Sequence, residues 1–143
     1  MKKVFSILVI AMLAMAMASC NKINETESLI VGEWLEMEVT GASTINGVPG
    51  ETISMLQPGE TTTLTFKKNH TYITTWKTED GEVTSNGTWS ATDNVLTMTS
   101  DGSDMSCHID KLDKNNMILS YTESGVDEGV SYSTYIVMKM KRI

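Results

Sequence analysis

Hydrophobic and polar residues alternate with a period of two along most of the chain beyond residue 29, and this pattern predicts a β domain. Val, Ile, Thr, Tyr and Trp fill the alternating runs, and Gly, Asp and Asn separate one run from the next. No run beyond residue 19 has the period of about 3.6 residues that marks an amphipathic helix. We expect eight strands, at about 30–40, 62–67, 70–77, 82–90, 95–100, 105–112, 117–122 and 130–141.

Tight turns join most of these runs, so each strand is expected to lie antiparallel to its predecessor. Asp80-Gly81 is typical of a hairpin turn, because both residues tolerate a positive φ. The segment from Gly41 to Glu60 differs, since it holds four glycines and both prolines, and we expect a long loop there that serves as a lid or binding loop. A meander of eight strands has two free edges unless it closes, so we expect an all-β, eight-stranded, antiparallel up-and-down barrel. A two-sheet sandwich is the alternative that periodicity leaves open.

The first strand illustrates how the alternation assigns side chains to faces. Simple alternation places Leu35, Met37 and Val39 on one face and Trp34, Glu36 and Glu38 on the other.

The first 19 residues have the layout of a signal peptide. Met1-Lys2-Lys3 is followed by a run from Val4 to Met17 that only Ser6 interrupts, and a helix needs about 20 apolar residues to cross a bilayer comfortably. Ala18 and Ser19 then precede Cys20, which resembles the lipobox of bacterial lipoproteins, although Met17 stands where Leu is usual. We therefore expect a cleaved signal peptide over 1–19, a lipidated flexible tether over 20–28 that begins at the acylated Cys20, and one domain over 29–143. An ordinary secretory signal with a chance cysteine is the alternative.

Charge and cysteine content narrow the function. Residues 1–19 contain two lysines and no acid, so their removal changes the net charge from −7 to −9, and such a domain should repel nucleic acid. With lipid on Cys20, Cys107 has no intrachain partner. It alternates with Met105 and Ile109, so we expect a small buried hydrophobe rather than a reactive thiol.

Catalytic and metal-binding patterns are weak. His108 and Asp110 share a strand face and could hold half a metal site with His70, but exposed polar positions explain them as well. Asp101-Gly102-Ser103-Asp104 lacks the further ligands of a calcium loop and favours a plain hairpin turn. We expect no enzymatic activity, no metal and no cofactor.

Several motifs together resemble a known family. Gly32-Glu33-Trp34 resembles the Gly-x-Trp signature of lipocalins, in which the tryptophan packs across one end of an eight-stranded barrel. The downstream motifs, in the same order, resemble the lipocalin-like lipoproteins of Bacteroidetes: Leu64-Thr65-Phe66, Lys68-Asn69-His70-Thr71-Tyr72, Gly87-Thr88-Trp89, Asn94-Val95-Leu96-Thr97-Met98 and Ile109-Asp110-Lys111-Leu112.

The resemblance implies an eight-stranded, calyx-like β domain with room for an apolar interior, but it does not imply a ligand. Our leading hypothesis is a non-enzymatic binding protein, anchored in the cell envelope through the lipid on Cys20. We expect the outer membrane, on its periplasmic or surface face, and a small apolar or amphipathic ligand. Candidate lining residues alternate with polar neighbours: Leu35, Met37, Leu64, Phe66, Met98 and Met117. The alternative is a filled barrel that acts as an interaction protein, either an accessory subunit or an adhesin of the envelope.

Overall fold

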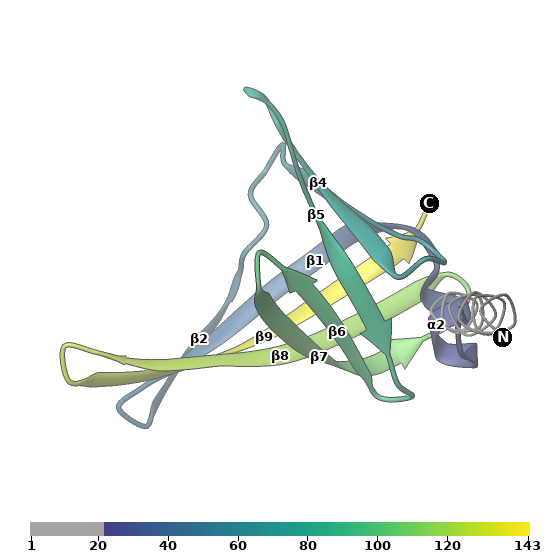
Figure 1. Cartoon of the computed structure of the whole chain (residues 1–143). Coiled ribbons are helices and arrows are strands. Elements are labelled where there is room, and N and C mark those ends of the chain that lie inside the picture. The colour runs from purple at the N-terminus through teal and green to yellow at the C-terminus, as the bar shows by residue number, and fades with distance from the viewer. Residues whose placement is uncertain (1–21) are drawn as a thin grey trace, which may run out of the picture.

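Nine β-strands follow one another along the chain in the computed structural model, which describes residues 22–143 (Figure 1). A short helix, α2, precedes them at Glu25–Ile30. All neighbouring strands are antiparallel, as expected for β-prone runs that short turns connect. The strands are β1 (Gly32–Ile45), β2 (Val48–Ser54), β3 (Thr61–Phe66), β4 (Thr71–Thr78), β5 (Gly81–Ala91), β6 (Val95–Ser100), β7 (Ser103–Leu112), β8 (Asn116–Asp127) and β9 (Val130–Arg142).

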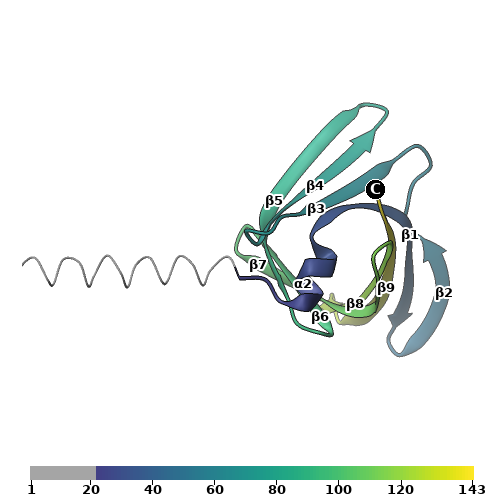
Figure 2. The ribbon, with the colours of Figure 1, turned by 90° about the vertical axis from the view of Figure 1, so that its right-hand side faces the viewer.

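Pairing between β1 and β9 closes the sheet into a barrel (Figure 2). The other edge of β1 is shared, because its first residues pair with β3 and its last residues pair with β2. Eight strands therefore form the barrel, and β2 is a ninth strand outside it. The predicted eight-stranded antiparallel barrel is confirmed, and the sandwich alternative is wrong.

The extra strand lies in the segment that we expected to be a long loop. β1 runs on to Ile45, and Asn46 and Gly47, with φ of 47° and 78°, form the tight turn into β2. Asn-Gly suits such a turn because both residues tolerate a positive φ. The loop prediction was therefore wrong over 41–54, and only residues 55–60 connect β2 to β3 without regular strand.

A β-bulge at Met37 reverses the facing of side chains along β1. Glu36 pairs with Met140 and Glu38 pairs with Lys139, so Met37 is an extra residue with no partner on β9. The faces predicted by simple alternation were therefore wrong, because Trp34 and Val39 both point into the barrel and Met37 is 56% exposed.

The barrel is continuous at the end that carries α2, here called the closed end, and splits toward the opposite, open end. β7 pairs with β8 only over His108–Leu112, and β5 pairs with β6 only over Thr88–Ala91. Beyond these residues the strands diverge as separate blades (Figure 1). One blade consists of β3, β4 and β5, one is the β6–β7 hairpin, and the third, the four-stranded blade, consists of β2, β1, β9 and β8 in that order.

The hydrophobic core fills the closed end. The buried side chains come from α2 and from all eight barrel strands, and they form one connected cluster. An aromatic group lies within it, where the Phe66 ring packs edge-on against Trp89 at 5.3 Å between centroids. Core members are Ile30, Trp34, Val39, Leu64, Phe66, Tyr72, Trp89, Ala91, Leu96, Met98, Cys107, Met117, Leu119, Ile136, Met138 and Met140.

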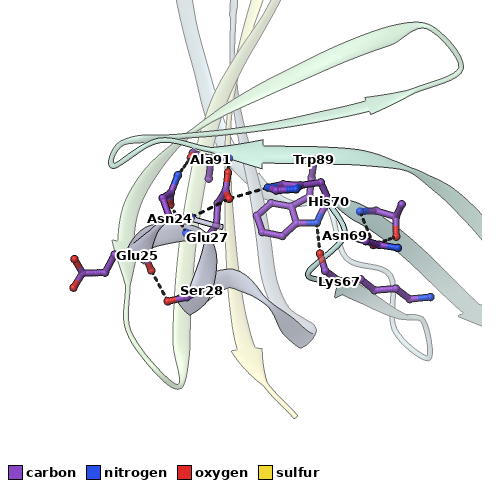
Figure 3. A network of polar contacts seen from close by, with 10 residues as sticks. Asn24, Glu25, Glu27, Ser28, Lys67, Asn69, His70, Trp89 and Ala91 are labelled. Atoms are coloured by element: carbon purple, nitrogen blue, oxygen red, sulfur yellow. Dashed lines mark hydrogen bonds and ion pairs between the residues drawn. The ribbon is translucent and has the colours of Figure 1, made fainter. Parts of the chain in front are cut away.

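Helix α2 covers the closed end and is held there by Glu27 (Figure 3). Asn24 and Glu27 form a capping box, in which each side chain accepts a hydrogen bond from the other's backbone N–H. The remaining Glu27 contacts reach the barrel: its carboxylate accepts the Ala91 N–H at 3.1 Å and lies 2.8 Å from His70 Nε2. With Glu27 only 5% exposed, the expected absence of a helix was wrong, and residues 25–28 are packed against the domain rather than free as a tether.

Trp34 is fully buried beside α2 and is held from two sides. Its Nε1 donates to the Ile30 carbonyl at 2.7 Å, and the Arg142 guanidinium lies over its ring, 4.2 Å from the centroid. Arg142 also donates to the carbonyls of Leu29 and Val31. A side chain at Gly32 would collide with this guanidinium, and the φ of Gly32 is +137°, so glycine is required there.

None of the helices within residues 22–143 combines the length and hydrophobicity needed to span a bilayer. The predicted signal peptide and Cys20 lie outside the described residues.

Candidate functional site

The structure divides the six predicted lining residues into two groups. Leu64, Phe66, Met98 and Met117 all point into the barrel, but they belong to the packed core at the closed end. Leu35 and Met37 point outward instead. The six residues therefore do not surround one space. The interior surface that a ligand could reach lies between the core and the open end.

A layer of polar side chains lies above the core, toward the open end. Glu36 points inward from β1, where burial raises the pKa of its carboxyl and a hydrogen bond with Thr62 opposes that change. Tyr121 points inward from β8, and burial followed by the negative charge of Glu123 raises the pKa of its hydroxyl. Cys107 and Glu36 add smaller contributions in the same direction, so these groups share one region of the interior.

A pocket of about 270 Å³ opens where β7 and β8 separate, and we call it the notch. Met105 and Tyr121 supply its apolar and aromatic surface, since both are only partly buried and pack against the edge of the core. Acidic and hydroxyl side chains surround them. The lining residues are Asp104, Met105, Ser106, Tyr121, Thr122 and Glu123.

The inner face of the four-stranded blade is apolar and exposed. The register places Ile45 beside Val48 and Tyr132 on this face, and it places Ile53 beside the inward-facing Gly41. Ile53 is 62% exposed, although it continues the inner surface of the barrel. A side chain at Gly41 would collide with Met55, whose thioether covers the same face. The barrel interior therefore extends into an open, apolar surface beyond the core.

A second pocket, of about 400 Å³, lies on the outside of the barrel over β5 and β6. Hydroxyl side chains that face away from the core make up most of its lining: His70, Thr88, Trp89, Ser90, Thr97 and Thr99. Its hydroxyls make no hydrogen bond to His70 within the described residues, since His70 Nε2 is bound to Glu27, so the pocket holds no assembled pair of nucleophile and base.

The histidines and the cysteine have structural surroundings. His70 binds Glu27, and His108 Nδ1 lies 2.8 Å from the carboxylate of Asp110 on the outer surface. Residues 22–143 contain no group of three or more His, Cys, Asp and Glu side chains arranged to hold a metal ion. Burial of Cys107 raises the pKa of its thiol to about 11, so the nucleophilic thiolate is suppressed at neutral pH.

Sequence reasoning missed Glu36 and Tyr121 as inward-facing groups, and it placed Met105 on the same face as the buried Cys107 without connecting it to a pocket. For Glu36 the cause is the bulge at Met37, because alternation counted back from Val39 assigns it to the wrong face. The notch depends on where pairing between β7 and β8 stops, and no local pattern in either strand encodes that point.

Comparison with known proteins agrees with this architecture. The sequence model of the lipocalin-like domain matches residues 30–138. The crystal structure of a lipocalin-like protein from Bacteroides uniformis superposes with a TM-score of 0.53 at 11% sequence identity, covering 80% of this chain and 99% of that one. Ail, the attachment invasion locus protein of Yersinia pestis, covers 79% of this chain and 99% of its own at 10% identity, with a TM-score of only 0.36. No curated protein matches the chain.

Proposed function

Because this chain belongs to the family of lipocalin-like domains, we propose that it is a membrane-anchored binding protein that holds a small amphipathic molecule at the open end of its barrel. The anchor in this proposal is lipid on Cys20, in the outer membrane. The ligand site combines the notch with the inner face of the four-stranded blade.

One observation carries the proposal, namely that apolar side chains remain exposed on the inner surface of the barrel beyond the core. Soluble proteins tend to cover apolar patches of this kind, and exposed ones often mark a binding site. The patch lies beside polar groups at the notch, and binding sites for small molecules typically combine an apolar wall with a few polar groups. The inner-face residues concerned are Ile45, Val48, Ile53, Met55, Val130 and Tyr132.

The packed closed end is the observation that favours the alternative function, an interaction protein with a filled barrel. Because packed side chains fill the closed end of the barrel, the same exposed blade could instead bind a protein partner. An interaction protein would use the blade as a docking face without taking up a small molecule.

Dye binding separates the two functions. Protein carrying Cys20→Ser, which removes the proposed anchor, should bind an environment-sensitive apolar dye with saturable one-to-one stoichiometry, and amphipathic molecules should displace the dye. Ile53→Glu should weaken dye binding by about tenfold, because it places a charge in the apolar wall.

The matched control is Val126→Glu. Val126 is 73% exposed on the outer face of the same blade, so this variant should bind the dye as the parent does. Unsaturable binding, or equal effects of the two substitutions, would favour the interaction protein.

A further inference from the structure

We propose that the ligand at the open end is a cationic amphiphile whose ammonium head group enters the notch while its alkyl tail lies on the inner face of the four-stranded blade. This inference rests on the proposed function and adds the chemical class of the ligand.

The basic side chains of the described residues are concentrated at one end of the barrel, whereas acidic ones occur at both ends, with Asp93 and Asp113 in turns at the closed end. Most basic side chains of residues 22–143 lie at the closed end: Lys22, Lys67, Lys68, Lys111, Lys114, Lys141 and Arg142. Lys77 and Lys139 are already paired with Glu82 and Glu38 on the outer surface. The turns at the open end carry acids instead, at Glu79, Asp80, Asp101 and Glu128. An anionic head group would therefore be repelled from the open end, and a cationic one would be attracted.

The notch offers the groups that bind an ammonium ion. The Glu123 carboxylate faces inward from β8 and has no basic partner among the ion pairs of residues 22–143. The Tyr121 ring stands next to it in the lining, and aromatic faces attract cations within about 6 Å. The Met105 thioether adds a soft apolar surface for the methylene groups beside the charge.

A second carboxylate lies deeper in the barrel. Glu36 points inward near enough to Tyr121 for its charge to affect the Tyr121 hydroxyl, and it has no salt-bridge partner within the described residues. Asp104 lies on the outer face of β7, where its carboxylate accepts a hydrogen bond from the Thr99 hydroxyl at 2.6 Å. Glu123 and Glu36 are therefore two carboxyl groups near Tyr121 that have no basic partner among the ion pairs of residues 22–143.

The tail has a continuous path away from this point. Glu123 pairs with Thr134, and two residues further along β8 Gly125 pairs with Tyr132, whose ring covers the space that a side chain at Gly125 would fill. Tyr132 in turn stands opposite Ile45 on the inner face. An alkyl chain leaving the notch would thus run over aromatic and aliphatic side chains rather than into water.

Three amphiphiles with the same tail test the inference. Dodecylammonium, dodecanoate and dodecyl glucoside, each below its micellar concentration, are titrated by calorimetry into the full chain carrying Cys20→Ser. We expect dodecylammonium to bind about fivefold or more tightly than the glucoside, and dodecanoate to bind most weakly. Glu123→Gln should reduce dodecylammonium affinity by about fivefold and leave glucoside affinity unchanged.

Glu79→Gln is the matched control, because it removes the same charge at the open end but on the β4–β5 turn. If Glu79→Gln weakens dodecylammonium binding as much as Glu123→Gln does, the notch is not the head-group site and the inference fails. Equal affinity for all three amphiphiles also overturns it while leaving the proposed function intact. If none of the three binds, the proposed function fails as well.

Discussion

Trp34 concentrates much of the stability of the closed end in one side chain. It is fully buried, donates a hydrogen bond to the Ile30 carbonyl and lies under the Arg142 guanidinium, so it links α2, β1 and β9. Gly32 makes this arrangement possible by leaving room for the guanidinium. The Gly-x-Trp spacing thus has a physical reason in this chain, because the glycine makes room for the cation that covers the tryptophan two residues later.

Trp34→Ala should destabilise the domain by about 3–5 kcal/mol, since it leaves a large cavity in the core and removes the surface on which Arg142 stacks. Chemical denaturation followed by fluorescence or circular dichroism measures this change. Trp76→Ala is the control, because Trp76 is 42% exposed on the β4–β5 hairpin and should cost far less. Similar losses in the two variants would contradict the role of Trp34.

At the scale of elements, the strands could be predicted well, but the facing of side chains along β1 could not. Alternation and turn residues located the eight barrel strands, because each strand has one buried face and turns need Gly, Asn or Asp. The bulge at Met37, the strand β2 and the helix α2 were missed. The bulge and β2 arise because one edge of β1 pairs first with β3 and then with β2, and this change of partner has no local sequence signal. Helix α2 was missed because six residues are too few to show a helical period.

Deletion of Met37 tests whether the bulge sets the phase of β1. Without the extra residue, either Trp34 and Glu36 or Val39 and the residues after it must turn to the opposite face. We expect the deletion variant to lose cooperative unfolding or to melt far below the parent protein. Met37→Ala keeps the residue count and alters only an exposed side chain, so its free energy of unfolding should change by less than about 0.5 kcal/mol. Comparable melting temperatures for the two variants would be incompatible with this account.

The attachment of α2 to the barrel should weaken in acid. Burial opposes ionisation of Glu27, but hydrogen bonds from the Ala91 and Asn24 N–H groups and the contact with His70 outweigh it, so the Glu27 pKa lies below its ordinary value of 4.5. A carboxylate with a lowered pKa in the folded state stabilises the fold at neutral pH. That stability is lost as the pH falls from near the ordinary value through the folded value.

Glu27→Gln should therefore melt below the parent protein at pH 7, and the difference between the two should shrink as the pH is lowered below about 4.5. Melting temperatures over a pH series give the comparison. Hydrogen bonds, first from Ser120 to Asp110 and from the Asn115 N–H to Asp113, also lower the pKa of those carboxyls. Both proteins share these groups, so only the difference between the two melting curves reports on Glu27. A difference that stays constant with pH would argue against a charged Glu27.

At the scale of the whole molecule, the barrel was predictable and the binding surface was not. Closure follows from the strand count and the antiparallel order, which are local features of the sequence. The open end depends on how far each pair of strands stays together, and that is settled by packing among distant residues. Four of the six candidate lining residues therefore proved to be core residues, Leu35 and Met37 proved to face outward, and the inner face of the four-stranded blade was overlooked.

The proposed anchor gives a prediction at this scale. Cys20→Ser should release the protein from the membrane fraction into the soluble fraction, because one cysteine would carry the whole lipid anchor. Fractionation of cells with immunodetection measures the change. Cys107→Ser is the control, since this buried thiol has no part in anchoring and should leave the protein in the membrane fraction. Retention of the Cys20→Ser protein would rule out the lipid anchor.

The position of α2 sets the direction from which a ligand can arrive. A hydrogen bond from its side chain to the Ala91 carbonyl fixes Asn24 to the closed end. Asn24 is four residues from Cys20, and a segment of that length reaches at most about 14 Å. The 14 residues of β1 span about 46 Å from the closed end toward the opposite rim. With lipid on Cys20, the closed end would therefore rest near the bilayer and the mouth would face the aqueous side. Cargo would then be exchanged with the surrounding water or with another protein, and not by lateral diffusion out of the host membrane.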